Sequence, residues 1–178
     1  MQELLTDDHL DLDGLLDRLF VALGNGNAAE VSKHLDMFWA RLAMHIRAEN
    51  LHLFPSILRT ARAGWQDRTG VSLPELDLVE ETIRDLDNDH SYFMRELGKT
   101  VKQVFDIKKG PGDLEKDFSI MRERLIELRQ RLEKHNEVEE SLVYPWGEML
   151  DADKLPDLSS KIRKELENLP PRFHGVGE

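Results

Sequence analysis

Residues 45–55 read HIRAENLHLFP, and residues 135–145 read HNEVEESLVYP. Each segment has a His, a Glu four positions after it and a Pro ten positions after it. Residues four apart lie on one face of an α-helix, about one turn from each other. The repeat therefore predicts two helices that each present an imidazole and a carboxylate side by side. The four residues are His45, Glu49, His135 and Glu139.

The apolar residues around these segments recur at alternating spacings of three and four, which is the helical period. A first helix is expected to end at the Gly24–Asn27 turn cluster, and a second to begin near Ala28. A third follows GVSLPE, with Pro74 suited to its first turn, and a fourth follows KKGPGD. Pro55 is expected to kink the second helix. Short connections between four amphipathic helices predict an all-α, up-down-up-down four-helix bundle.

At 178 residues the chain is long enough for one well-filled core and short for two. We expect residues 1–150 to form the bundle, with 64–74 as its longest connection. Residues 151–178 are expected to form a C-terminal tail, a helical appendage in which DLSSKIRKELENL is a short helix.

Composition excludes several classes of function. The formal net charge of −11 disfavours binding to nucleic acid or to an anionic membrane. The chain has no Cys, which excludes disulfides, thiolate catalysis, iron–sulfur clusters and Cys-ligated zinc. The opening MQELLTDDHLDLDG lacks the features of a signal peptide, and no later stretch approaches the roughly 20 apolar residues of a membrane span. We expect a cytoplasmic protein.

Six polar residues occupy helix positions that the neighbouring turns fill with apolar side chains. They are His9, His45, Glu49, His90, His135 and Glu139. Counting about 1.5 Å of rise per residue from the expected turns places them at similar heights. A buried layer of this kind is costly without compensation. Two divalent cations would compensate, because imidazole nitrogen and carboxylate oxygen suit Fe, Mn or Zn and a carboxylate can bridge two ions.

Three acidic residues lie next to these six in the sequence. Glu140 could replace Glu139 as a ligand, but its counterpart in the first repeat is Asn50, so the repeat favours Glu139. Asp8 and Asp89 each precede a His, and we interpret them as solvated residues, with support of the ligands as the alternative.

Three further His residues lie outside the predicted ligand set. His52 lies one turn beyond Glu49 and is expected in the buried seam, either as a supporting group or gate or as an ordinary core His. His34 is three turns from His45 and His174 lies in the tail, so both are expected to be structural or solvent-facing.

The order His, His-x-x-x-Glu, His, His-x-x-x-Glu, with LLTDDHLDLDGLLDRL near the start, closely resembles the hemerythrin-like (HHE cation-binding) family. The resemblance covers residues 4 to about 148. It implies a non-haem di-iron centre with a bridging oxo or hydroxo group, although Mn or Zn stays possible. The implied terminal ligands are His9, His45, His90 and His135, and the implied bridging carboxylates are Glu49 and Glu139.

The sequence departs from the oxygen-carrying members of that family. They add a fifth His one turn from the third-helix His, where this chain has Leu86 and Met94 on either side of His90, and they use Asp in place of Glu139. The pattern is closer to the sensor and iron-repair branches, although the repair branch often carries an added Cys-containing domain.

The resemblance predicts a protein that binds or senses a small diatomic, O2 or NO, or redox state. One alternative is detoxification of NO or peroxide, or repair of iron centres. Another is a metal-free helical interaction module. The sequence leaves open whether the protein is an enzyme, and it names no protein partner.

Overall fold

The computed structural model describes residues 1–65, 73–107 and 113–173, and these residues form helices and turns without a strand. The prediction of an all-α protein is confirmed. The α-helices are α1 (Gln2–Gly24), α2 (Ala28–Ala48), α3 (Phe54–Arg62), α4 (Leu76–Ile107), α5 (Leu114–Val138), α6 (Tyr144–Glu148) and α7 (Leu155–Leu166). Two π-helical segments, η1 (Glu49–Leu53) and η2 (Glu139–Val143), join α2 to α3 and α5 to α6, and a 3-10 turn, η3, covers Pro171–Phe173. Most of the predicted 64–74 connection, most of KKGPGD and His174 lie outside the described residues.

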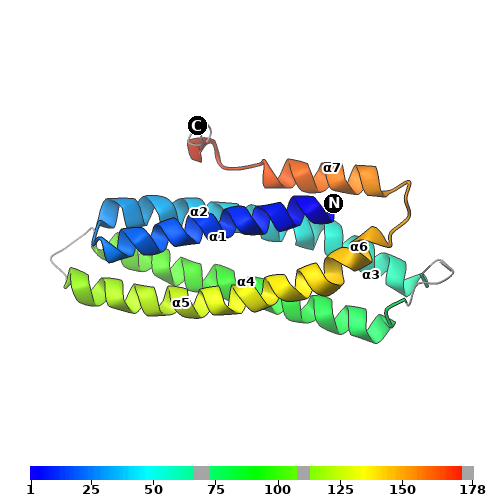
Figure 1. Cartoon of the computed structure of the whole chain (residues 1–178), viewed down its shortest axis with the longest axis horizontal. Helices are drawn as coiled ribbons and strands as arrows, with labels where there is room; N and C mark the ends of the chain where they lie inside the picture. Colours follow the sequence, from blue (N-terminus) through cyan, green and yellow to red (C-terminus); the bar gives the residue numbers. More distant parts are fainter. Residues whose placement is uncertain (66–72, 108–112, 174–178) are drawn as a thin grey trace.

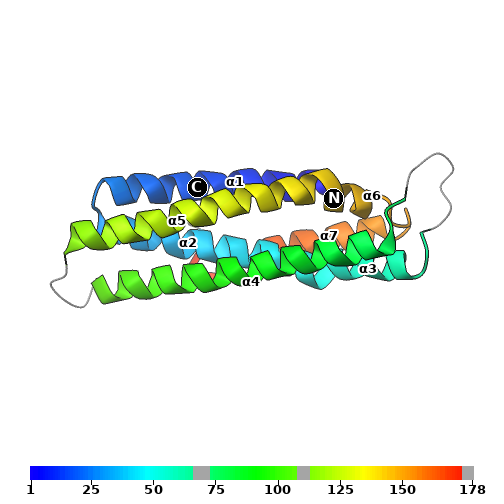
Figure 2. The ribbon, with the colours of Figure 1, turned by 90° about the horizontal axis from the view of Figure 1, so that it is seen from below.

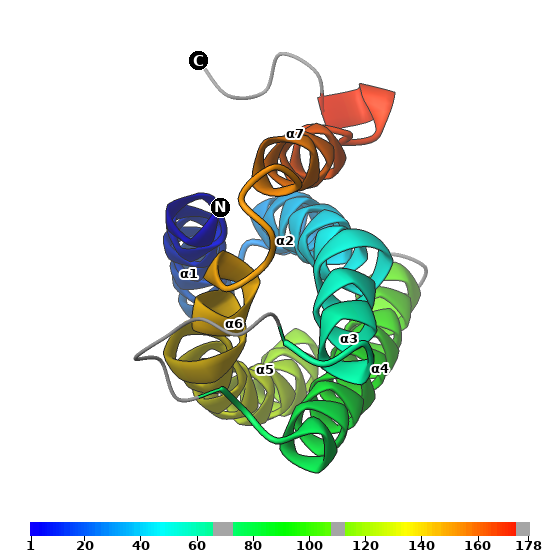
Figure 3. The same ribbon diagram turned by 90° about the vertical axis from the view of Figure 1, so that its right-hand side faces the viewer.

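The four long helices α1, α2, α4 and α5 run side by side along the longest axis of the molecule (Figure 1). Seen from below, α5 lies beside α1, and α4 lies beside α3 (Figure 2). The view along the axis shows the long helices around a common centre, with α7 outside them against α2 (Figure 3). All four long helices therefore have a face toward the same interior.

The ends of the helices follow the turn signals of the sequence. Gly26 has φ +65°, and the side chain of Asn27 accepts hydrogen bonds from the backbone N–H groups of Ala29 (3.1 Å) and Glu30 (3.2 Å). These bonds satisfy donors in the first turn of α2 that have no partner within the helix. The predicted turn between the first two helices is therefore confirmed, whereas Pro74 lies just before α4 and not in its first turn.

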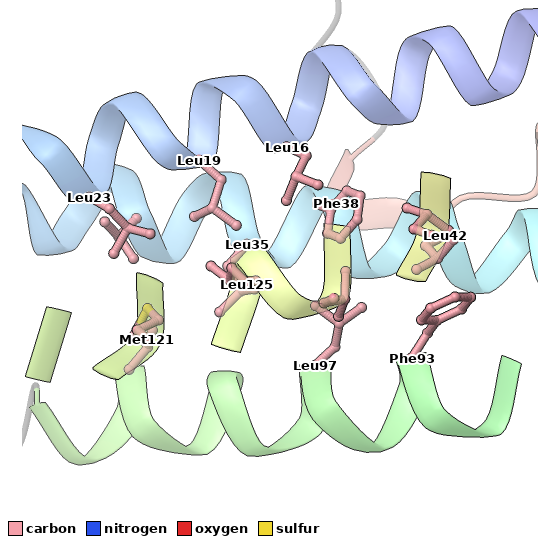
Figure 4. Packing of buried hydrophobic residues seen from close by; sticks show 14 of the residues in the cluster. Leu16, Leu19, Leu23, Leu35, Phe38, Leu42, Phe93, Leu97, Met121 and Leu125 are labelled. Carbon is pink, nitrogen blue, oxygen red and sulfur yellow. The ribbon is translucent and has the colours of Figure 1, made fainter. Parts of the chain in front are cut away.

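Two clusters of buried apolar residues fill the interior. One is centred on α1, α2, α4 and α5, and Figure 4 shows its packing around Leu16, Phe38, Leu97 and Leu125. The second joins the start of α1 to α3, α6 and α7 and includes Ile57. The six predicted site residues separate the clusters: on each long helix the His lies between residues of the first cluster and residues of the second.

The two π-helical segments were not predicted from the sequence. In η1 the N–H of Phe54 donates to the carbonyl of Glu49, five residues earlier, and in η2 the N–H of Tyr144 donates to the carbonyl of Glu139. Each segment leads into a short α-helix with a Pro in its first turn. Pro55 is therefore the second residue of α3 and follows a π-helical turn, where the sequence predicts a kinked but otherwise continuous α-helix.

The wider π turn also changes which side chains face the interior. Beyond Glu139, Val143 and Tyr144 are fully buried, whereas Leu142 is 38% exposed. His52, its counterpart in the first repeat, is likewise only partly buried. The expectation that His52 lies in the buried seam is therefore wrong, because the α-helical period does not continue through η1.

Candidate metal centre

The six residues singled out in the sequence meet in one buried layer. None is more than 3% exposed. Their imidazoles form two pairs: the Nε2 atoms of His9 and His45 are 3.1 Å apart, and so are those of His90 and His135. Helices α1 and α2 supply the first pair, and α4 and α5 supply the second. The predicted common height of the four His residues is confirmed.

Two carboxylates lie between the His pairs, and each faces both pairs. For Glu49, Oε1 is 3.4 Å from His45 Nε2 and Oε2 is 3.3 Å from His90 Nε2. For Glu139, Oε2 is 3.3 Å from His9 Nε2 and Oε1 is 3.1 Å from His135 Nε2. Every carboxylate oxygen thus has a different imidazole nearest to it, and Glu139 Oε1 also lies 3.8 Å from His90 Nε2.

The ligand atoms form two groups, each with two imidazole nitrogens and one oxygen from each carboxylate. Within each group, all ligand atoms lie within 4.8 Å of one another. We call the group that contains His9 and His45 the first half-site, and the group that contains His90 and His135 the second half-site. Glu49 and Glu139 belong to both. Each group could hold a metal ion.

Unpaired oxygens test whether a cation fits. Glu49 Oε2 and Glu139 Oε1 are buried, and although an imidazole nitrogen lies 3.3 Å and 3.1 Å from them, neither accepts a hydrogen bond in the described part of the chain. Leaving one buried acceptor unsatisfied costs about 1–3 kcal/mol, and more when the group is charged. Both oxygens face the second half-site, and a mixed imidazole and carboxylate set suits Fe, Mn or Zn. The residues present fit a pair of such ions.

An Asp lies behind one imidazole of each half-site. Asp8 Oδ2 is 3.0 Å from His45 Nδ1, and Asp89 Oδ2 is 3.4 Å from His135 Nδ1. Asp8 is only 5% exposed and also bonds to Arg41. Our interpretation of Asp8 as a solvated residue is wrong: the position before His9 faces the neighbouring helix α2. The bond at Nδ1 of His45 holds that ring so that Nε2 points to the centre, whereas Asp89 lies near His135 as a charge without a hydrogen bond in the described residues.

The other two imidazoles are held by the residue that follows each shared Glu. His9 Nδ1 is 2.8 Å from Glu140 Oε1, and His90 Nδ1 is 3.0 Å from Asn50 Oδ1. Asn50 also donates from Nδ2 to Asp87 Oδ1 at 3.1 Å, which fixes the orientation of its amide. The sequence indicates Glu140 only as an alternative to Glu139, and it does not predict the position of Glu140 behind His9.

Tyr144 is the site residue that sequence reasoning missed. Its side chain is fully buried, and its hydroxyl donates to Glu49 Oε1 at 2.8 Å. The hydroxyl oxygen of Tyr144 also lies 3.0 Å from His9 Nε2 and 3.4 Å from Glu139 Oε2. A usable signal was present, because Tyr144 follows Glu139 by five positions as Phe54 follows Glu49. Comparison of the two repeats therefore aligns Tyr144 with Phe54 and marks a hydroxyl that only one repeat has.

The carboxylates of the layer raise the pKa values of the imidazoles beside them. Burial lowers the pKa of His135, but the carboxylates of Glu139 and of nearby Asp89 outweigh it and raise that pKa to about 9. His45 shows the same balance: burial opposes the charge, whereas Glu49 and Asp8 hold its pKa well above the usual value. The neighbouring carboxylates therefore favour the positively charged form of both imidazoles in the metal-free protein, and a metal ion would have to displace the additional proton of each.

The acidic groups shift in the opposite direction. Burial raises the pKa of Glu49, but the neighbouring imidazoles of His45 and His90 outweigh it and bring the pKa well below its usual range. For Tyr144, burial and then the carboxylates of Glu139 and Glu49 raise the pKa well above its usual value. In the metal-free protein the charged form of the Glu49 carboxylate is therefore favoured, and the phenol of Tyr144 keeps its proton and donates a hydrogen bond to Glu49 Oε1.

The remaining His residues lie away from this layer. His34 Nε2 is 3.3 Å from Glu30 Oε2, one turn earlier in α2. His52 is partly exposed, and its Nε2 is 4.0 Å from Glu165 Oε2 on α7. His52 is therefore neither a core residue nor a neighbour of the ligands, whereas the prediction that His34 lies away from the site is confirmed.

No protein-family model, no curated protein and no solved structure matches this chain, so the geometry of the site carries the functional argument. Within residues 1–65, 73–107 and 113–173, no helix combines the length and apolarity that crossing a membrane requires.

Proposed function

We propose that this chain is a hemerythrin-like protein that holds two iron ions and uses them to bind or sense a small diatomic, O2 or NO, or the redox state of its surroundings. The observation that carries the proposal is the sharing of the two carboxylates. Glu49 and Glu139 each direct one oxygen to each half-site, which is the arrangement that bridges two ions.

The ligand chemistry supports iron. Each half-site offers two imidazole nitrogens and two carboxylate oxygens. Iron in such mixed sites usually has six donors, so open positions would remain at the centre for an added ligand. When bound, the iron pair supplies reversible ligand binding or a change of redox state. The chain's own residues hold the imidazole rings and exclude bulk water.

Burial supports a ligand of very small size. The six residues are at most 3% exposed, and apolar clusters close the layer on both sides along the axis. A bulky substrate would have to separate packed helices to reach the centre, whereas a diatomic molecule would not. The same enclosure would protect a reactive centre from competing solvent.

We also propose how the chain is arranged around this centre. Residues 1–150 form an up-down-up-down four-helix bundle around the centre, and residues 151–178 form a tail whose helix α7 packs on the outside of α2. The tail reaches the bundle close to the site, because Glu165 of α7 accepts a hydrogen bond from Arg47 at 2.6 Å. It supplies none of the proposed ligands.

The test is anaerobic loading with Fe(II), followed by metal analysis and an absorption spectrum during cycles of O2 or NO addition and removal. The proposal expects two irons per chain and a spectral change that reverses when the gas is removed. Measurable consumption of NO or peroxide would instead favour detoxification or repair. A folded protein that binds no iron would favour the metal-free interaction module and overturn the proposal.

A further inference from the structure

The two half-sites differ in the oxygen atoms that surround them. In the first half-site, the hydroxyl of Tyr144 lies 3.0 Å from His9 Nε2, 2.8 Å from Glu49 Oε1 and 3.4 Å from Glu139 Oε2. These are three of the four ligand atoms of that group. The phenol oxygen therefore lies inside the first half-site, alongside its ligands.

The second half-site has an apolar ring at the corresponding position. Phe54 follows Glu49 as Tyr144 follows Glu139, and its ring stacks on His90 with centroids 5.7 Å apart and planes 1° from parallel. A phenyl ring offers no oxygen to a metal. The carboxylate oxygens that face this half-site are also the two without a hydrogen-bond partner in the described ranges.

We propose that Tyr144 is a fifth protein ligand to the ion of the first half-site, so that an added small ligand binds at the ion of the second half-site. The inference rests on the proposed function, because it requires the iron pair. Phenolate oxygen is an established protein ligand of iron, and ligands release their protons when a metal binds. The O–H bond of the phenol breaks, the oxygen binds the ion, and the proton leaves to buffer without electron transfer.

The two half-sites would offer different numbers of protein donor atoms to their ions. The first half-site would have five, namely two nitrogens, two carboxylate oxygens and the phenolate, whereas the second would have four. A solvent bridge between the ions would complete six donors at the first ion and leave a position open at the second. The open position would lie on the side of His90, His135 and Phe54.

Resonance Raman spectroscopy of iron-loaded protein, oxidised with ferricyanide, tests the inference directly. Excitation in the visible absorption band should enhance the ring modes of a phenolate bound to Fe(III), and ring-deuterated tyrosine should shift them. The chain has only two Tyr residues, so the assignment is simple. If the natural protein binds two irons per chain and shows no phenolate modes, the inference about Tyr144 is wrong and the proposed function still stands. If the protein binds no iron, the proposed function itself is wrong.

A pair of matched variants assigns the modes to one residue. Tyr144→Phe should lose the modes and the visible band, whereas Tyr92→Phe should keep both. Tyr92 is a suitable control because its partly exposed ring lies beneath the guanidinium of Arg131, 4.2 Å from it. Unchanged modes in Tyr144→Phe protein would overturn the assignment.

Azide, used as a probe anion, tests where an added ligand binds. It should bind once per centre and leave the phenolate modes in place, because it enters at the second half-site. Loss of the phenolate modes as azide saturates the protein would show that the anion replaces Tyr144, and would overturn the placement of the open position.

Discussion

The two half-sites share their ligands and differ in what surrounds them. In both, two imidazoles lie with Nε2 atoms 3.1 Å apart, each carboxylate contributes one oxygen, and an Asp supports one imidazole. The first half-site also has Tyr144 and the charged Glu140, where the second has Phe54 and the neutral Asn50. The ligands that the half-sites share would allow both to hold a metal ion. The residues that differ, Tyr144 against Phe54 and Glu140 against Asn50, would give the two ions different surroundings.

The largest expected effect comes from removing what the half-sites share. Glu49→Ala or Glu139→Ala should reduce bound iron from two ions to fewer than one per chain, because each carboxylate serves both half-sites. Thermal stability should fall with the metal content, since metal-binding free energy contributes to folding. Metal analysis and thermal unfolding of the same samples measure both effects.

His34→Ala is the control for these variants, because His34 lies on the same helix as His45 and forms its ion pair with Glu30, one turn earlier and away from the ligands. It should leave metal content and stability nearly unchanged. Normal iron loading in both Glu variants would contradict the shared role of the carboxylates.

A smaller effect should follow from weakening one half-site at a time. Asp8→Asn and Asp89→Asn each remove the charge behind an imidazole, and groups in this position typically change metal affinity by about 10–100-fold. Asp8 should matter more, because it is more buried and its oxygen is closer to the imidazole (3.0 Å against 3.4 Å). Metal titrations against a competing chelator measure the difference. Equal effects would contradict the ranking.

The pH dependence of the metal-free protein tests the charges of the layer. His135 has a pKa of about 9 against 6.5 in the unfolded chain, so the folded state binds the proton more tightly. Its stabilising contribution is complete below pH 6.5 and is lost as the pH rises through about 9. His45 shifts in the same direction. Urea unfolding in the presence of chelator should therefore show stability falling between pH 6.5 and 9.

Iron-loaded protein is the comparison for that experiment. In it the imidazoles hold metal in place of protons, so this alkaline loss should be absent. Glu49 has a lowered pKa, so its contribution is present above pH 4.5 and is lost as the pH falls through the lowered value. Metal-free stability that stays constant or rises from pH 6.5 to 9 would contradict the charge distribution described here.

The smallest expected effect comes from making the half-sites more alike. Glu140→Asn would give His9 the neutral partner that Asn50 gives His90. A charged acceptor strengthens a hydrogen bond by about 1 kcal/mol over a neutral one, which corresponds to roughly fivefold in affinity. Calorimetric metal titration should show a loss of that size or less. A larger loss would indicate that Glu140 binds metal itself.

The sequence predicted the helices and the six residues because both depend on spacing along the chain. His45 and Glu49 lie one turn apart on any α-helix, and turn clusters such as Gly24–Asn27 set the heights at which helices meet. The surroundings of the six residues depend instead on how helices face one another. Asp8 reaches His45 only because α1 and α2 pack closely there.

The π turns are a second reason why the sequence does not predict which side chains surround the ligands. A single i+5 hydrogen bond at Glu139 rotates the following residues, so that Tyr144 points to the ligands and Leu142 points outward. The α-helical period cannot anticipate this change, and proline positions alone do not specify it. The aromatic difference between Tyr144 and Phe54 therefore gained its meaning only from the structure.

We propose that one buried centre holds two ions through two shared carboxylates. Anomalous diffraction at the iron absorption edge, from crystals of iron-loaded protein, locates the ions themselves. We expect two peaks, one beside His9 and His45 and one beside His90 and His135, with Glu49 and Glu139 between them. A single peak, or a folded layer with no anomalous signal, would contradict it.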